Sequence, residues 1–310
     1  MTKLIYAIAL SLSILVGGVA SANETQLSSP HPTIAILDTA IEGTNPIFTS
    51  SLIFEVCVTE WSACPNSLSE MEGPSSASLP LPVISKNGFD HGTQMASLAI
   101  STNPNIKIVF VRIIGANAQG FRQATSEKTV VSALNWVLQN KDRFNIQAVS
   151  MSQGHHNLGP AGTDYCPKTP ITEGKIQDLI NVGVPVFFPT GNARDHSRID
   201  WPACIPASIA IGATMPAGSI AIYSNHDPLR TDFFAKGQNR VTTVGGRVIN
   251  SGGTSGSTVI AATQWATLKA AKPNLTYSEI YELLSRTATF TYNSKITSGR
   301  LINLEAALKG

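Results

Sequence analysis

Short apolar runs recur along the chain, and segments with helical spacing of apolar residues separate them. The runs are residues 33–37, 107–113, 148–151, 184–188 and 207–212. Uninterrupted apolar runs are typical of strands that are buried on both faces, and strands that alternate with helices are typical of a parallel sheet. The pattern therefore predicts an α/β fold in which a mostly parallel sheet is flanked by helices on both faces.

Clear boundary signals mark several of the expected helices. Apolar residues repeat at helical spacing in residues 126–140, and Thr169-Pro170 places a proline at the first turn of another helix. An Ala-rich helix follows Ser255 and ends before Pro273, and a capping box opens the next one at Thr276. Residues 55–88, in contrast, contain several Pro and Gly residues and are expected to form a loop.

Residues 1–22 have the three regions of a secretory signal peptide. A basic start at Lys3 is followed by the apolar stretch 4–19 and by the small residues Ala20-Ser21-Ala22. An uncleaved anchor is the alternative, but the apolar run is short for a membrane span. We therefore expect a secreted or periplasmic protein with no membrane contact after cleavage. A short segment at residues 23–32 would precede a single domain at residues 33–310.

Charge and cysteine content narrow the class of protein. The chain has 22 Lys and Arg residues against 20 Asp and Glu residues, which gives no basic excess for nucleic-acid binding. Its four cysteines allow three disulfide connectivities, and export favours oxidation. Pairing Cys57 with Cys64 and Cys166 with Cys204 is preferred because each pair lies within one region of the chain. A zinc site is the rival interpretation, but no Cys-x-x-Cys segment is present.

Four polar residues stand where open α/β sheets build their sites. Asp38 follows the first apolar run and Asn192 the fourth, whereas His91 and Ser255 stand at expected helix starts. Each has an ordinary alternative as a turn residue or a helix cap. Together they provide a serine nucleophile, a histidine base, an orienting carboxylate and an amide that can donate to an oxyanion.

Several segments resemble those of the subtilisin-like serine peptidases, in the family's order. They are residues 36–40, 91–96, 150–154, 190–192, 201–203, 209–214, 253–255 and 299–303. The resemblance runs from about Thr33 to the C-terminus. It implies a subtilisin-like, single-domain exported serine endopeptidase that uses no cofactor. Its catalytic residues would be Asp38, His91 and Ser255, with Asn192 in the oxyanion hole.

The resemblance also implies where a substrate binds. A polypeptide would add as a β-strand between Ser152-Gln153-Gly154 and the loop Gln119-Gly120-Phe121. We expect a polypeptide substrate as the partner and a monomeric protein.

Three departures from the family pattern limit the resemblance. Ala40 replaces the usual Gly after the aspartate, and Gly256-Ser257-Thr258-Val259 replaces the family's Met-Ala-Ser-Pro. The segment between Ala99 and Lys107 is short, so we expect the calcium loop of many relatives to be absent and no metal site to be present. The altered stretch after Ser255 supports a rival function, in which the same fold binds peptides without cutting them. A small-molecule binding protein with a parallel sheet is a more distant rival, because it has no reason to group the four polar residues.

Overall fold

The computed structural model describes residues 31–310 except residues 61, 87, 118, 124, 157, 161–164 and 297. The predicted signal peptide and residues 23–30 lie outside the described residues. Within them, one sheet of ten strands organises the molecule, in the order β11-β12-β8-β7-β6-β5-β1-β4-β2-β3. Its strands are β1 (Thr33–Asp38), β2 (Leu52–Val58), β3 (Glu70–Glu72), β4 (Lys107–Arg112), β5 (Ala148–Met151), β6 (Val186–Pro189), β7 (Ile209–Thr214), β8 (Phe233–Lys236), β11 (Thr289–Thr291) and β12 (Gly299–Leu301).

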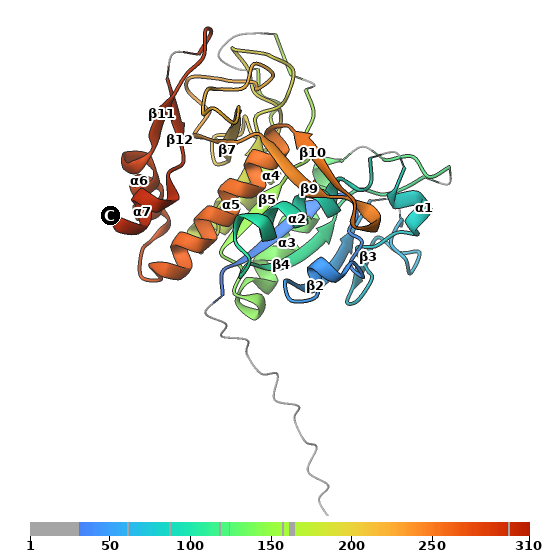
Figure 1. Cartoon of the computed structure of the whole chain (residues 1–310). Coiled ribbons are helices and arrows are strands. Elements are labelled where there is room, and N and C mark those ends of the chain that lie inside the picture. The colour runs from blue at the N-terminus through green and yellow to red at the C-terminus, as the bar shows by residue number, and fades with distance from the viewer. Residues whose placement is uncertain are drawn as a thin grey trace, which may run out of the picture.

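The interior of this sheet is parallel. Strand β1 pairs in parallel with β4 on one side and with β5 on the other, and β6, β7 and β8 continue in parallel. Antiparallel pairs occur only at the two edges of the described sheet, where β3 joins β2 and β11 joins β12. Figure 1 shows these edges at opposite ends of the molecule. A separate antiparallel hairpin consists of β9 (Gln238–Thr242) and β10 (Val248–Gly252).

Helices cover both faces of the sheet, as the sequence predicts (Figure 1). They are α1 (Leu81–Ile84), α2 (His91–Thr102), α3 (Glu127–Phe144), α4 (Pro170–Asn181), α5 (Thr254–Ala271), α6 (Tyr277–Thr287) and α7 (Leu304–Lys309). Successive side chains of a strand point to opposite faces. In β1, Ala35 and Leu37 pack with α3 and α4, whereas Ile34 and Ile36 pack with α2 and α5. Both faces of β1 are therefore buried, which explains its uninterrupted apolar sequence.

The prediction of a loop over residues 55–88 is wrong in part, because β2 is a strand of the main sheet. Glu55 interrupts its apolar pattern, yet this residue is only 9% exposed. Its carboxylate accepts a hydrogen bond from Ser75 N at 3.0 Å. Burial raises the pKa of Glu55, although backbone hydrogen bonds from Ser75 and Ala77 oppose that effect. The partners of this carboxylate come from tertiary structure, so local sequence gave no sign of the strand.

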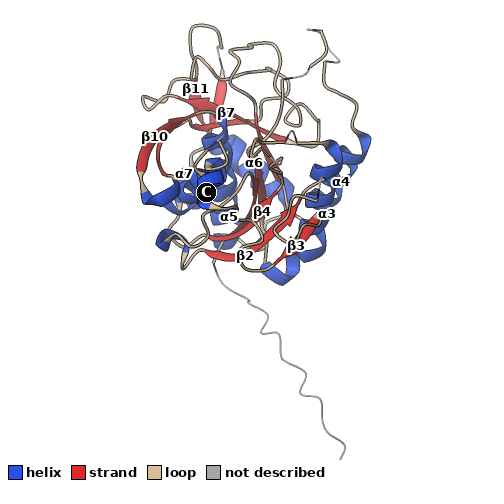
Figure 2. Ribbon diagram, turned by 90° about the vertical axis from the view of Figure 1, so that its right-hand side faces the viewer, coloured by secondary structure: helices blue, strands red, loops and turns tan. Residues whose placement is uncertain are grey.

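Two disulfides join the pairs that the sequence analysis prefers. The first links Cys57 on β2 to Cys64, with Cα atoms 5.8 Å apart. The second links Cys166 to Cys204, with Cα atoms 5.7 Å apart. The second bridge spans 38 positions and ties the segment before α4 to the loop after β6. The first bridge therefore holds the loop that follows β2 to that strand, and the second joins two loop segments, of the kind that Figure 2 shows in tan.

Candidate active site

Asp38 occupies the carboxyl end of the strand at which the sheet order reverses. Strand β4 lies on one side of β1 and β5 on the other, so the chain winds outward in both directions from β1. Sites in open α/β sheets form at such switch points, because the loops from the two neighbouring strands diverge there. Asp38 is fully buried at this position.

The Asp38 carboxylate meets His91, the first residue of α2. His91 Nδ1 lies 2.8 Å from Asp38 Oδ1. A carboxylate can only accept, so Nδ1 carries the proton and leaves Nε2 as the basic atom of the neutral ring. The backbone N–H of Thr39 also donates to Asp38 Oδ1, at 2.7 Å. The carboxylate is thus held from its own strand while it orients the imidazole.

Gly92 lets the start of α2 approach the end of β1. A Cβ atom at Gly92 would lie 2.5 Å from both Ala40 O and Phe110 Cζ, closer than packed atoms allow. The Gly92 N–H donates to Thr39 Oγ1 at 2.9 Å, which fixes the same junction by a hydrogen bond. The glycine that follows the histidine is therefore a packing requirement for the position of His91.

Opposing effects act on the charge of His91. Burial lowers its pKa, whereas the charge of Asp38 and the hydrogen bond to it raise the pKa. Arg122 lowers the pKa and Asp90 raises it by smaller effects. The net result is a raised pKa, so the imidazole is a stronger base than an isolated histidine.

Ser255 lies in the first turn of α5. The preceding Gly253 has φ of 149°, a conformation that favours glycine, and the helix begins at Thr254. Ser152 Oγ donates to Ser255 O at 3.0 Å, and Ser257 Oγ donates to Ala235 O at 3.1 Å. The altered stretch after Ser255 thus still forms a regular helix start, docked by these hydroxyl groups.

Asn192 follows β6 and lies beside the same helix start. Its Oδ1 accepts hydrogen bonds from Thr254 N at 3.0 Å and from Thr254 Oγ1 at 3.2 Å. These two donors decide which end of the amide is the oxygen. The Nδ2 group therefore points away from Thr254, and no hydrogen bond from it to a described residue is present. Asn192 itself is exposed, so this donor is accessible.

A cavity of about 220 Å³ brings His91, Asn192 and Ser255 together. Met95 and Leu98 of α2 line its apolar wall, and Gly256 borders it without a side chain. Three of the four residues predicted as the active site thus border one cavity, and the fourth, Asp38, lies buried behind His91.

The two segments predicted to bind substrate lie next to each other. Arg122 follows Phe121 in the chain, and its Nη2 donates to Gln153 Oε1 at 2.5 Å. This hydrogen bond joins the two segments. Phe121 is 57% exposed and Gly154 is exposed. Gln153 behaves differently, because its side chain is only 7% exposed and donates to Asp38 Oδ1 at 2.9 Å.

Loop structure explains the exposed positions of Gln119 and Phe121. The side-chain oxygen of Asn117 accepts from Gln119 N at 3.0 Å and from Phe121 N at 2.9 Å. Gly120 has φ of 79°, as a tight turn requires. The loop is therefore a side-chain-stabilised turn that presents Phe121 outward.

Sequence analysis missed the part that Arg122 plays at this site. The residue adjoins the predicted substrate loop, and its charge was the only available signal. Its partner Gln153 is 31 positions away. Only the folded chain brings them together.

The adjacent histidines His155 and His156 have separate structural partners. The ring of His155 stacks on Trp201 with ring centres 4.8 Å apart, and His156 Nδ1 lies 2.5 Å from Asp200 Oδ1. No group of three or more His, Cys, Asp or Glu side chains that could hold a metal occurs in the part of the chain that the structure describes. None of the helices among the described residues is long and apolar enough to cross a bilayer.

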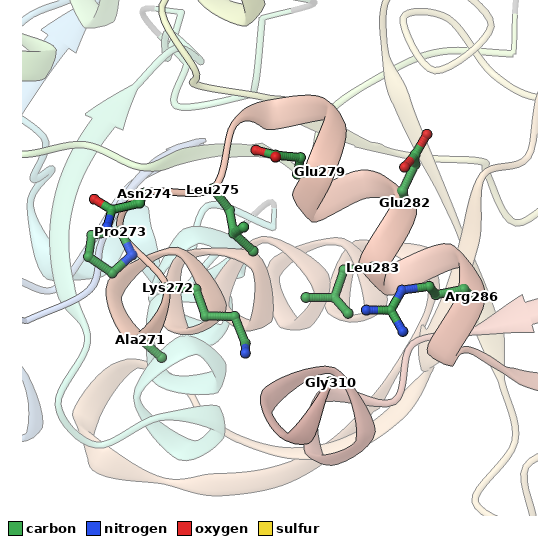
Figure 3. A pocket seen from close by; sticks show the side chains of 10 residues that line it. All are labelled: Ala271, Lys272, Pro273, Asn274, Leu275, Glu279, Glu282, Leu283, Arg286 and Gly310. Atoms are coloured by element: carbon green, nitrogen blue, oxygen red, sulfur yellow. The ribbon is translucent and has the colours of Figure 1, made fainter.

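A larger cavity, of about 540 Å³, lies far from these residues. It is bounded by the end of α5, by α6 and by Gly310, and the side chains of Lys272 and Arg286 extend toward it (Figure 3). Ser255 lies in the first turn of α5 and this cavity at the last turn, near Ala271, so 16 residues of helix, or about 24 Å, separate them. Although this cavity is larger, it is therefore too far from Ser255 to take part in chemistry there.

One protein family and several known proteins resemble this chain. The family model described as the subtilase family matches residues 29–302. Subtilisin amylosacchariticus from Bacillus subtilis subsp. amylosacchariticus is 25% identical over 235 residues, which cover 72% of this chain and 56% of that protein. A cuticle-degrading serine protease from Arthrobotrys oligospora is 28% identical over 155 residues, which cover 49% of this chain and 34% of that protein. The chain thus matches little more than half the length of the first of these relatives.

Solved structures share the fold. A protease from Pseudoalteromonas arctica superposes with a TM-score of 0.70 at 18% identity, covering 93% of each chain. A cold-adapted subtilisin-like serine proteinase gives a TM-score of 0.63 at 20% identity, covering 87% of each chain. Because the family model spans most of the chain and these folds agree, the protein belongs to the subtilase family.

Proposed function

We propose that the protein is an exported serine endopeptidase that uses Asp38, His91 and Ser255. The observation that carries this proposal is the Asp38–His91 hydrogen bond of 2.8 Å beside a cavity that Ser255 also borders. Family membership supports it, because subtilisin and other serine proteases are among the relatives.

In this mechanism Ser255 Oγ attacks the carbonyl carbon of the scissile peptide bond. His91 Nε2 accepts the serine proton and then gives it to the leaving amine, which breaks the C–N bond. Asp38 holds the imidazole in the required tautomer and stabilises its protonated form. A water molecule then attacks the acyl-enzyme with His91 again as the base, and the carboxylic acid product leaves.

Asn192 and the backbone N–H of Ser255 would bind the oxyanion that forms during both attacks. The orientation of the Asn192 amide supports this role, since Thr254 occupies its oxygen and leaves Nδ2 available. The helix start adds a partial positive charge at the same place.

We further propose that a polypeptide substrate lies as an added strand against Ser152–Gly154, opposite Gln119–Phe121. The exposure of Gly154 on one segment and of Phe121 on the other supports this arrangement. Residues 1–22 would serve as a signal peptide and residues 33–310 as the peptidase domain. One relative, from Thermus sp., is described as an extracellular serine proteinase, which supports export.

Labelling with an organophosphonate serine probe tests the proposal directly. Oxidised, purified protein should react at one site, hydrolyse peptides from a library and lose both properties on Ser255→Ala substitution. Peptide binding without labelling or hydrolysis would identify a binding module instead. Normal turnover of the Ser255→Ala variant would refute the assignment of the nucleophile.

A further inference from the structure

Gln153 forms a bridge between the buried carboxylate and the surface of the groove. Its Nε2 donates to Asp38 Oδ1 at 2.9 Å, and its Oε1 accepts from Arg122 Nη2 at 2.5 Å. Asp38 is fully buried and Gln153 nearly so, whereas Arg122 is exposed. A continuous line of hydrogen bonds therefore runs from solvent to His91 through three side chains.

Chemistry determines the direction of each bond in this line. An arginine has only donors and an ionised carboxylate only acceptors. The amide of Gln153 matches both at once, with its oxygen toward Arg122 and its nitrogen toward Asp38. The positive charge on Arg122 polarises the amide and so strengthens its donation to Asp38. A hydrocarbon side chain at position 153 could make neither bond.

Donation to Asp38 has two consequences for His91. Three donors converge on the same carboxylate oxygen, namely Thr39 N, His91 Nδ1 and Gln153 Nε2. They restrict the rotation of the carboxylate and hence the position of the ring bonded to it. Gln153 also withdraws part of the negative charge that would otherwise act on His91.

The charged groups that act on His91 come from three places. Asp38 lies at the end of β1, Asp90 precedes the histidine in the chain, and Arg122 lies on the substrate loop. The two carboxylates raise the pKa of His91, whereas Arg122 lowers it. Arg122 is thus the one of these groups that works against protonation of the ring.

We propose that Gln153 is a positioning residue for the Asp38–His91 pair and that Arg122, through Gln153, limits the affinity of His91 for a proton. This inference rests on the proposed peptidase function but concerns residues to which the family resemblance gives no such role. It assigns the side chain of Gln153 to the catalytic machinery, while the backbone of Ser152–Gly154 remains available for a bound peptide. The active range of the enzyme would then extend to lower pH than Asp38 and His91 alone permit.

Two variants test the proposal with separate readouts. Gln153→Met keeps the length of the side chain but removes both hydrogen bonds. Arg122→Gln keeps a donor for Gln153 Oε1 but removes the charge. Lys309→Gln, which removes a charge on the exposed end of α7, is the matched control. Each is measured as the pH profile of kcat/KM and, in a Ser255→Ala background, as the NMR titration of the His91 ring.

Both Gln153→Met and Arg122→Gln should move the acid limb and the His91 titration to higher pH. Gln153→Met leaves Asp38 a stronger partner for the protonated ring, and Arg122→Gln removes a charge that repels that ring. Gln153→Met should also lower kcat about 10- to 100-fold, the usual worth of a hydrogen bond to a charged group, with KM little changed. The effect of Arg122→Gln should weaken as salt is added, because Arg122 is exposed. Lys309→Gln should leave both readouts unchanged.

The titration decides the proposal whether or not the protein hydrolyses peptides. If neither variant moves the His91 titration, or if both move it to lower pH, the proposal is wrong. A loss of kcat in Gln153→Met with an unmoved titration would show a merely structural role and would also overturn it. If the titration moves as expected in a protein that cuts no peptide, Gln153 and Arg122 keep their roles and the proposed function fails.

Discussion

Replacing Asn192 separates two properties of one side chain, its donor and its acceptor. The acceptor, Oδ1, takes hydrogen bonds from Thr254 N and Thr254 Oγ1, and Thr254 is fully buried. The donor, Nδ2, is the group proposed to bind the oxyanion. Asn192→Ala removes both, whereas Asn192→Asp keeps an acceptor of the same shape and removes only the donor.

The two variants should therefore differ in stability and agree in activity. Losing one oxyanion donor costs about 10²–10³ in kcat. A buried N–H left without a partner costs about 1–3 kcal/mol of folding free energy. We expect Asn192→Ala to lose both amounts. Asn192→Asp should retain most of the stability yet lose at least as much kcat, because a carboxylate beside the oxyanion adds repulsion.

Steady-state kinetics with one peptide substrate and urea unfolding of the same preparations measure these effects. KM should change little in both variants, since the donor acts on the oxyanion and not on the bound peptide. If Asn192→Asp retained kcat within about threefold of the unaltered protein, the oxyanion role of Asn192 would be refuted. If Asn192→Ala lost no stability, the account of its bonds to Thr254 would fail.

Three further predictions concern the supports of the site. Gly92→Ala should lower the melting temperature and lower kcat at least tenfold, because its Cβ would lie 2.5 Å from Ala40 O. Gly174→Ala in α4 is the control, because open space surrounds Gly174, and it should stabilise the protein by about 0.5–1 kcal/mol. Stabilisation by both substitutions, seen in thermal melts, would contradict this reasoning. Removing the Cys166–Cys204 bridge by alanine substitution should lower the free energy of unfolding, measured with urea, by about 4 kcal/mol, and removing Cys57–Cys64 should lower it by about 2 kcal/mol, because the loops span 38 and 7 positions. The reverse order would show that loop length does not determine how much these bridges stabilise the fold. Asp38→Asn should lower kcat about 10⁴-fold and move the acid limb of kcat/KM to lower pH. The charge that raises the pKa of the His91 imidazole is then gone, so the neutral, active form persists in more acid solution. An acid limb that moved to higher pH would contradict this prediction.

Much of the fold could be predicted because its strands are buried on both faces. In β1 the residues that face α3 and α4 are as apolar as those that face α2 and α5. Such a run is visible in the sequence without knowledge of its neighbours. Strand β2 could not be predicted in the same way, because Glu55 in its middle is accommodated by Ser75, 20 positions later.

The residues of the candidate site also differ in whether the sequence could predict them. Asp38, His91, Asn192 and Ser255 could be proposed from the sequence because each stands at the end of a strand or the start of a helix. Such ends meet at one edge of a parallel sheet, so the position of such a residue in the chain also determines where it lies in the fold. The structure puts three of them around one cavity and bonds the fourth to His91.

The sequence by itself therefore determined which chemical groups the protein carries and at which edge of the sheet they gather. The tertiary structure alone decided which polar atoms pair there. Arg122, Gln153 and Asp38 are joined across 31 and 115 positions, and no local pattern distinguishes a buried Gln153 amide from one that lines the groove. Hydrogen bonds of this kind depend on atoms within about 3 Å of each other, a precision that only the packed chain supplies.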